Sequence, residues 1–489
     1  MTRERFQQND NMNSVSDPLK PPASRSPRDY VALIGSVLAA LLTAFVMSHR
    51  DDVPREAAFM IGIFVLAALL WVTEALPLFA TALLVIGLEI VLLANPGNWV
   101  GFGFEYGTSP TMNRILHAAA DPVLVLFLGG FLLAQAAVKE GVDRAMSSLL
   151  LRPFGNKPIW IMLGLMLVTA LFSMWMSNTA TTAMMITLVI PMLAQMPGKD
   201  RFRKALVLCV PFAANIGGMG TPIGSPPNAV AVGFLHKINI EVSFLEWTLL
   251  ASPLVLVLLI FTWLLLWKLF TPVDLNLRIE LTSHTVTPRG WFVVSVFTIT
   301  AVLWMTDRLH GLPAAAVALF PAIALTATGI LNRNDLNGLE WNILILIAGG
   351  IALGAGMQIT GLDQIIVNWL PLSGGGVILV LVMLVLATVF IGTFMSNTAA
   401  ANLILPIGIS SATFLDQGDG VIKQVALSIA LAASASMALP ISTPPNAIAY
   451  ARDEVSTRDM AVAGSIIGVV AAVLIIVFSG PVLRLWGFE

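Results

Sequence analysis

Met-Ser-Asn-Thr-Ala stands at residues 176–180, and the same five residues return at 395–399. Each copy interrupts a long apolar stretch, 158–197 in the first half of the chain and 371–413 in the second. A polar tripeptide in the middle of an apolar run predicts a helix that stops and restarts there. Each stretch could therefore enter a membrane and return to the side from which it came.

Two further pairs of motifs show that the halves of the chain are related. Ser-Pro-Pro-Asn-Ala at 225–229 matches Thr-Pro-Pro-Asn-Ala at 443–447, and Gly-Gly at 129–130 matches Gly-Gly at 349–350. The three pairs of motifs are separated by 219, 218 and 220 residues. Such constant spacing indicates an internal repeat.

Composition places the chain in a membrane. Its 489 residues are 57% apolar and 11% charged, whereas soluble domains are about 45–50% apolar and about 25% charged. The single cysteine, Cys209, excludes an intrachain disulfide, and no Cys/His cluster suggests a metal site or cofactor. We expect membrane lipid to surround the chain, and we expect no nucleic-acid partner.

We predict an all-α polytopic membrane protein with about eleven transmembrane helices plus two re-entrant hairpins. Residues 1–29 are polar and lack an apolar run, so we expect a disordered cytoplasmic tail. The predicted apolar segments are 30–48, 57–73, 77–94, 122–138, 205–235, 248–267, 290–306, 313–331, 342–360, 421–451 and 460–483. The predicted parts are the first transmembrane helix (30–56), repeat 1 (57–270, with hairpin 158–198 and broken helix 205–235), a cytoplasmic linker (271–289) and repeat 2 (290–489, with hairpin 371–413 and broken helix 421–451).

The distribution of Lys and Arg predicts the orientation, because cytoplasmic loops accumulate these residues. Placing the N-terminus in the cytoplasm puts most basic residues inside, including the cluster at 199–204. Basic residues flank both ends of 158–197, so both ends should be cytoplasmic, whereas the flanks of 371–413 suit the outside. The C-terminus then lies outside. These charges leave open whether each stretch is a shallow hairpin or a pair of full spans.

An odd number of crossings separates the two repeats, so the second copy is inverted. Inverted repeats with interrupted helices in matching places are the sequence signature of a transporter binding site near the middle of the membrane. Ser-Asn-Thr offers hydroxyl and amide oxygens, and a helix that restarts there presents unpaired N–H groups to an anion. Neither motif contains Lys, Arg or His, which favours neutralisation of a bound dianion by co-bound cations.

Structural interpretations compete with these functional ones. A single Ser, Thr or Asn in a membrane helix usually bonds to its own helix or to a neighbour, but paired motifs in register favour function. We expect the Gly-Gly pairs to be close-packing sites. Glu74, Glu89 and Asp307 are interpreted as interface or packing residues, because they have poor matches across the repeat.

At these motifs the sequence resembles the divalent anion/sodium symporter family, over roughly residues 30–489. The family includes bacterial dicarboxylate transporters and mammalian sodium-coupled citrate carriers. The resemblance implies a homodimer whose protomers each have a scaffold domain and a transport domain that moves like an elevator. It also implies transport of succinate, malate, fumarate or citrate into the cell, in the inner (plasma) membrane, with sodium as coupling ion.

Carried onto matching positions, the resemblance implies two sodium sites and one substrate site. The first sodium site would use Ser173, Ser177, Asn178 and Gly224, and the second Gly392, Met395, Asn397 and Ser442. The substrate would meet Ser177, Asn178, Thr179, Ser225, Asn397, Thr398, Thr443 and Pro444. Family members often have a hydroxyl residue where this chain has Gly392, which puts side-chain ligation at the second site in doubt.

Three alternatives remain at this point. The chain could be a sodium-independent dicarboxylate exchanger of the same family, or a sulfate transporter. A membrane-embedded enzyme is disfavoured because the sequence has no His-Glu-x-x-His, no Gly-x-Gly-Asp and no plausible Ser/His pair.

Overall fold

The computed structural model describes residues 26–101, 109–272, 285–369, 376–415 and 418–486. Every regular element in these ranges is a helix, which confirms the predicted all-α membrane fold. Most of the predicted tail, 1–25, and the central part of the predicted linker, 273–284, lie outside the described residues.

The first half of the chain forms α1 to α11. The helices are α1 (Pro27–Ser48), α2 (Arg55–Thr73), α3 (Leu78–Glu89, followed by a π-helical turn at Ile90–Ala94), α4 (Met112–Ala119), α5 (Val123–Lys139), α6 (Val142–Leu151), α7 (Pro158–Ser173), α8 (Asn178–Ala194), α9 (Phe202–Gly218), α10 (Pro226–Lys237) and α11 (Phe244–Leu269).

The second half forms α12 to α22. The helices are α12 (Pro288–Met305), α13 (Asp307–His310), α14 (Ala314–Ala327), α15 (Arg333–Asn337), α16 (Trp341–Thr360), α17 (Leu362–Trp369), α18 (Gly376–Phe394), α19 (Asn397–Phe414), α20 (Asp419–Ser434), α21 (Pro444–Tyr450) and α22 (Thr457–Trp486).

Both polar interruptions coincide with a break between two helices. Helices α7 and α8 flank the first Ser-Asn-Thr, and α18 and α19 flank the second. The two arms of the first pair have 16 and 17 residues, which at ~1.5 Å per residue is about 24–26 Å and shorter than a hydrocarbon layer of about 30 Å. Each Pro-Pro-Asn motif likewise opens a new helix, α10 or α21, after an irregular loop.

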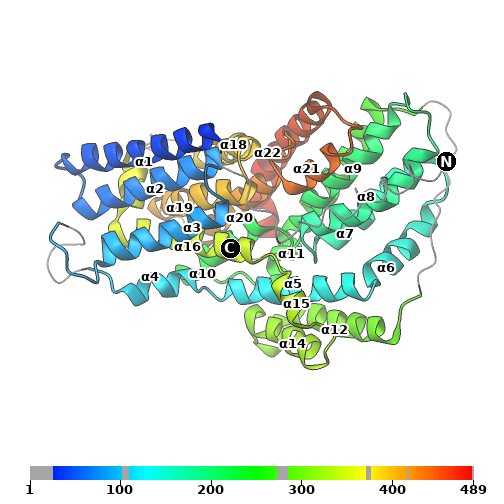
Figure 1. The fold of residues 1–489 in the computed structure, drawn as a ribbon, viewed down its shortest axis with the longest axis horizontal. Helices are drawn as coiled ribbons and strands as arrows, with labels where there is room; N and C mark the ends of the chain where they lie inside the picture. The colour runs from blue at the N-terminus through cyan, green and yellow to red at the C-terminus, as the bar shows by residue number, and fades with distance from the viewer. Residues whose placement is uncertain (1–25, 102–108, 273–284, 370–375, 416–417, 487–489) are drawn as a thin grey trace, which may run out of the picture.

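Eight helical segments in the described residues are long and apolar enough to cross a membrane. Among them, α16 is the most enclosed, with 78% of its apolar window buried, and α1 the least, with 11%. Figure 1 shows α1 along one edge of the molecule, in agreement with its low burial. Helix α1 therefore faces lipid or another protein over most of its surface.

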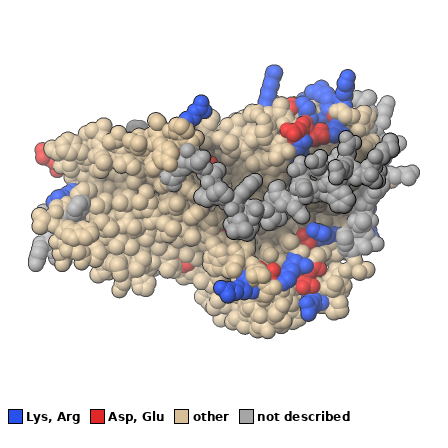
Figure 2. Space-filling model, in the orientation of Figure 1, with Lys and Arg blue, Asp and Glu red and all other residues tan. Residues whose placement is uncertain are grey.

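On the face drawn in Figure 2, charged side chains gather toward one end. In Figure 2 most visible Lys and Arg residues lie over the half where α6 to α9 and α12 are found, while the half around α1 to α3 is largely uncharged. The predicted inner clusters belong to these same elements, for example at the start of α9. The absolute orientation in a membrane stays a prediction.

Close helix contacts explain the paired glycines. A Cβ atom on Gly129 of α5 would lie 2.7 Å from the Ala318 carbonyl oxygen of α14, and one on Gly349 of α16 would overlap Ala82 of α3. Glu89 is fully buried, and a Cβ on Gly356 of α16 would lie 2.5 Å from its carboxylate. These contacts support the packing interpretation of the glycines. Both carboxylate oxygens of Glu89 are buried without a hydrogen-bond partner among the described residues, so its packing role stays a prediction.

Five short helices were absent from the predicted segments: α4, α6, α13, α15 and α17. They have 4 to 10 residues and carry polar side chains beside apolar ones. A search for long uniformly apolar runs cannot detect such helices, because one face of each is polar. They connect the longer helices.

Candidate functional site

The two Ser-Asn-Thr motifs form the starts of the returning hairpin helices. Ser177 is the N-cap residue of α8, and its side-chain oxygen accepts a hydrogen bond from the Ala180 N–H at 3.2 Å. Ser396 holds the equivalent position at α19, without a side-chain capping bond. Serine is favoured at this position because its oxygen satisfies a backbone N–H group that has no partner within the helix.

The two Pro-Pro-Asn motifs also begin helices. Ser225 is the N-cap residue of α10, and Thr443 is the N-cap residue of α21, where its hydroxyl accepts from the Asn446 N–H at 3.3 Å. Proline follows each cap at the first helical position, which needs no backbone N–H donor. The motifs therefore create new helix N-termini inside the protein.

All four N-cap residues line one cavity of about 510 Å³. The eight predicted substrate residues lie on its walls: Ser177, Asn178, Thr179, Ser225, Asn397, Thr398, Thr443 and Pro444. The opposite wall is formed by α3, α5 and α16, through residues such as Phe79, Phe131 and Leu346. Residues far apart in sequence thus meet at one place, while their contact with a substrate stays a prediction.

Helix N-termini supply partial positive charge at the wall of this cavity. The helices that begin at its wall include α8, α10 and α19, which have 17, 12 and 18 residues. Each N-terminus carries about half a positive charge and favours anions. Among the described residues that line the cavity there is no Lys, Arg or His, and Glu340 is the one charged side chain.

Oxygen atoms converge behind the first hairpin tip, at the predicted first sodium site. Ser173 is fully buried, and its hydroxyl donates to the Ala214 carbonyl oxygen at 2.8 Å. The Asn178 amide faces that hydroxyl and two carbonyl oxygens. With its nitrogen turned toward them, it donates to Ser173 Oγ at 2.5 Å, Gly224 O at 3.0 Å and Ala214 O at 3.2 Å.

Gly224 has to be glycine for these oxygens to approach one another. A Cβ atom there would lie 2.6 Å from the Gly218 carbonyl oxygen and 3.0 Å from the Ser173 carbonyl oxygen. The loop between α9 and α10 therefore closes tightly on the hairpin. All four residues of the predicted first site, Ser173, Ser177, Asn178 and Gly224, belong to this region.

The second hairpin is attached to the loop between α20 and α21 in a similar way. The Ser442 hydroxyl donates to the Thr393 carbonyl oxygen at 2.7 Å and accepts from the Leu439 N–H at 3.2 Å. Gly392 and Met395 are buried beside it. The Asn397 Oδ1 atom is buried and has no hydrogen-bond partner among the described residues. An unsatisfied buried oxygen is costly unless a ligand completes it.

The asparagines of the Pro-Pro-Asn motifs hold the irregular loops together. The Asn228 amide donates to the carbonyl oxygens of Gly218 at 2.9 Å and Thr221 at 2.8 Å. Likewise, the Asn446 amide donates to those of Met437 at 2.8 Å and Leu439 at 3.0 Å. The proline breaks were predicted from the sequence, whereas this role of the asparagines was not.

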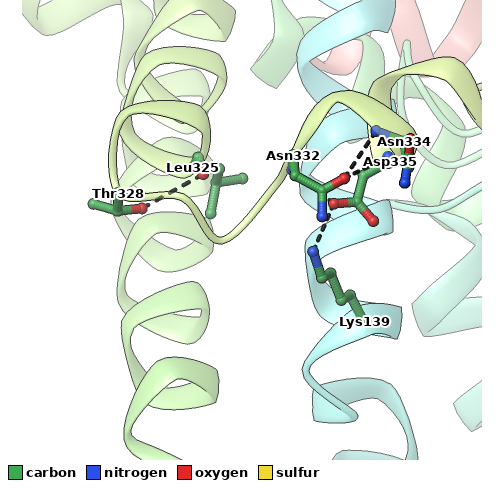
Figure 3. Close-up of polar contacts among 6 residues, drawn as sticks. All are labelled: Lys139, Leu325, Thr328, Asn332, Asn334 and Asp335. Carbon is green, nitrogen blue, oxygen red and sulfur yellow. Dashed lines mark hydrogen bonds and ion pairs between the residues drawn. The ribbon is translucent and has the colours of Figure 1, made fainter.

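Glu340, the N-cap residue of α16, was not among the predicted site residues. Helix α15, just before it, is fixed by a capping box in which Asn332 and Asp335 exchange hydrogen bonds, and by an ion pair of 2.6 Å between Lys139 at the end of α5 and Asp335 (Figure 3). Burial raises the pKa of the Glu340 carboxyl above its ordinary value, and a hydrogen bond with the Ser177 side chain partly opposes that shift. Glu340 thus joins the opposite wall to the hairpin tip.

A second cavity, of about 630 Å³, lies near the starts of α5 and α14 and the end of α10. It contains a contact of 3.2 Å between Asp121 and His236 and also borders Asp307. None of the predicted substrate or sodium residues lines it. The larger cavity is therefore not the candidate site.

Comparison with protein families gives one match along nearly the whole chain. The family model described as the sodium:sulfate symporter transmembrane region matches residues 29–486. An uncharacterized transporter of Haemophilus influenzae is 32% identical over 447 residues, covering 86% of this chain and 91% of that protein. A sodium-dependent dicarboxylate transporter, SdcS, of Staphylococcus aureus is 29% identical over 485 residues, covering 91% of this chain and 90% of that protein.

Two further similarities concern length and fold. An uncharacterized transporter of Schizosaccharomyces pombe is 29% identical over 481 residues, but the chain spans 54% of its length. The crystal structure of the Alcanivorax borkumensis YdaH transporter is similar with a TM-score of 0.53 and 14% identity, covering 85% of this chain and 98% of that one. At this identity the likeness concerns the fold alone.

Proposed function

This chain belongs to the family of the sodium:sulfate symporter transmembrane region, and from that premise we propose that it is a sodium-coupled secondary active symporter that brings di- or tricarboxylates into the cell. The substrates are of the succinate, malate, fumarate or citrate class. It is a membrane transporter and not an enzyme. The Staphylococcus aureus relative, whose name specifies sodium and dicarboxylates, supports this choice.

The main support for the proposal is the distribution of charge in the cavity that the four N-cap residues line, called the central cavity below. Helix N-termini line it, and no basic side chain does among its described residues. Helix ends supply fractional charges, so a dianion bound there needs further positive charge. Sodium ions provide that charge when they bind at the two hairpins. The substrate and its coupling ions then stabilise one another in the same part of the protein.

The first hairpin has a suitable set of oxygen atoms for sodium. Ser173 Oγ, Ala214 O and Gly224 O all face the Asn178 amide. With its nitrogen turned toward them, the amide satisfies these oxygens. A sodium ion among them would instead take the amide oxygen as an additional ligand, because hard cations prefer oxygen. Asn178 would then reverse its orientation when sodium binds.

The second hairpin offers Asn397 as the corresponding amide. Its Oδ1 atom is buried without a partner among the described residues, and the Ser442 hydroxyl fixes the adjacent loop. In this proposal Gly392, Met395, Asn397 and Ser442 hold the second sodium ion. The eight cavity residues named above hold the carboxylates, chiefly through hydroxyl, amide and backbone donors.

We propose an elevator mechanism in a homodimer. The hairpins and broken helices pack with one another around the site, whereas α3, α5 and α16 form its opposite wall. A cavity between two such groups of helices allows one group to slide and carry the site across. The protein would lie in the inner membrane with its N-terminus in the cytoplasm and its C-terminus outside, as the Lys and Arg distribution favours.

Two other functions are outcomes of the same test. A sodium-independent exchanger would use the same cavity with one carboxylate replacing another. A sulfate transporter is favoured by the description of the family, since sulfate is also a divalent oxyanion. Both differ from the proposal in measurable ways.

The test is uptake of labelled succinate, citrate and sulfate into proteoliposomes that contain the purified protein. We expect carboxylate uptake under an inward sodium gradient and little uptake when potassium replaces sodium. Rapid succinate counterflow in sodium-free buffer would establish the exchanger instead. Sodium-dependent sulfate uptake without carboxylate uptake would show that the proposed substrate class is wrong and that the proposed sodium coupling is right.

A further inference from the structure

Ser436 occupies the space that a side chain at position 392 would fill. A Cβ atom built on Gly392 would lie 2.7 Å from Ser436 Oγ and 2.8 Å from Ser436 Cβ. Ser436 is 1% exposed and lies in the irregular loop after α20. Gly392 is in the last turn of α18, close to the tip of the second hairpin. The glycine therefore makes room for a hydroxyl that another element supplies.

The first repeat has the opposite arrangement at the equivalent positions. With the spacings of the two motifs, Gly392 corresponds to Ser173 and Ser436 corresponds to Gly218. Ser173 carries the hydroxyl on the hairpin, and Gly218 on the broken helix leaves room for the Asn178 amide. Serine and glycine are thus exchanged between hairpin and broken helix from one repeat to the other.

The two hydroxyls bind equivalent backbone oxygens. Ser173 Oγ donates to Ala214 O at 2.8 Å, and Ser436 Oγ donates to Ala432 O at 3.0 Å. Ala214 and Ala432 are 218 residues apart, the spacing of the Pro-Pro-Asn motifs. Each hydroxyl therefore stands at the same point of its repeat although it comes from a different helix.

We propose that Ser436 supplies the hydroxyl ligand of the sodium site at the second hairpin, in the place that residue 392 leaves empty. The inference rests on the proposed sodium coupling. A serine that donates its proton to Ala432 O keeps lone pairs for a cation. A second observation, independent of the repeat, fits a cation at this hairpin: Asn397 Oδ1 is buried and has no hydrogen-bond partner among the described residues.

Four variants test the exchange. Ser436→Ala removes the hydroxyl, and Ser436→Gly removes the whole side chain. Gly392→Ser adds a side chain that collides with Ser436, so it should destabilise the protein. The double variant Gly392→Ser/Ser436→Gly copies the arrangement of the first repeat and should relieve that collision.

The readout is the sodium-dependent rise in melting temperature of the purified protein, with choline as the control cation. We expect Ser436→Ala to need about tenfold more sodium for the same rise, and the double variant to respond within about twofold of wild type. Ser428→Ala is the matched control, because Ser428 lies on α20, is fully buried and has no hydroxyl partner among the described residues. It should leave the sodium response unchanged.

The outcomes separate this inference from the function on which it rests. If wild type shows no sodium response at all, the proposed coupling is wrong. If wild type responds and Ser436→Ala responds equally, the coupling stands and the role of Ser436 is wrong. Should Ser436→Ala fail to fold, the double variant decides: a wild-type response supports the exchange, while a weak response or failure to fold overturns it.

Discussion

The Asn215 side-chain nitrogen lies 3.2 Å from Asn446 Oδ1 and 3.2 Å from Thr443 Oγ1. Asn215 belongs to the broken helix of the first repeat, and its partners begin α21 in the second. All three side chains are buried. This bridge joins the two halves of the chain directly beside the central cavity, so the loops that bear the candidate site are held by shared polar contacts.

Asn446→Ala should therefore destabilise the protein strongly. The substitution removes the acceptor of Asn215 and the donors to Met437 O and Leu439 O. Leaving buried polar groups unpaired costs about 1–3 kcal/mol. We expect a lower melting temperature in detergent even without sodium. Asn337→Ala, at an exposed position on α15, is the matched control. An unchanged melting temperature for Asn446→Ala would contradict the bridging role.

Asn178→Ala and Asn397→Ala should each abolish transport while the protein stays folded. Each removes the amide at a hairpin tip that faces the cavity. The measurement is sodium-driven succinate uptake by proteoliposomes, with size-exclusion chromatography to confirm a folded protein. Asn337→Ala should transport normally. Uptake close to wild type by both hairpin variants would show that the site has been assigned to the wrong residues.

Gly129→Ala should lower stability rather than substrate affinity. The added methyl group would lie 2.7 Å from both the Cβ atom and the carbonyl oxygen of Ala318, forcing α5 away from α14. Overpacking of this kind costs about 1–3 kcal/mol. Gly87→Ala is the control, because nothing lies within 4 Å of the added atom. A changed substrate affinity with an unchanged melting temperature would instead indicate a ligand-binding role.

The repeated motifs identified residues that lie together on the wall of one cavity, while their role in binding stays a prediction. Ser177 and Ser396 are both N-cap residues, as expected from the identical motif in the two copies. Both line the same cavity. The other wall could not be predicted. Glu340 has Ala120 at the equivalent spacing of 220 residues, so the repeat gives no signal there. Its place in the site depends on the tertiary packing of α16 and α15, which no local pattern specifies.

Glu340 places a negative charge in a cavity that we propose for anions. Because burial raises the pKa of its carboxyl, Glu340 takes up a proton at a higher pH than an ordinary glutamate as the pH falls. Its charge is present above that pKa and lost below it. In the proposed elevator, α16 stays in place while the hairpins move. The Glu340 carboxylate therefore repels the anionic substrate only when the site faces α15 and Lys139. On that side the carboxylate would favour substrate release.

The last prediction is that Glu340→Gln tightens substrate binding. Each negative charge of the substrate about 10 Å from the carboxylate, at an effective dielectric constant of about 20, is repelled by about 1.7 kcal/mol, so affinity should rise at least about tenfold. Calorimetry at saturating sodium would measure the substrate affinity of wild type and variant at a series of decreasing pH values. Wild type should bind more tightly as Glu340 loses its charge, whereas Glu340→Gln should change less. Glu340→Asp keeps the charge and serves as control. Equal or weaker binding by Glu340→Gln would show that the carboxylate does not oppose the substrate.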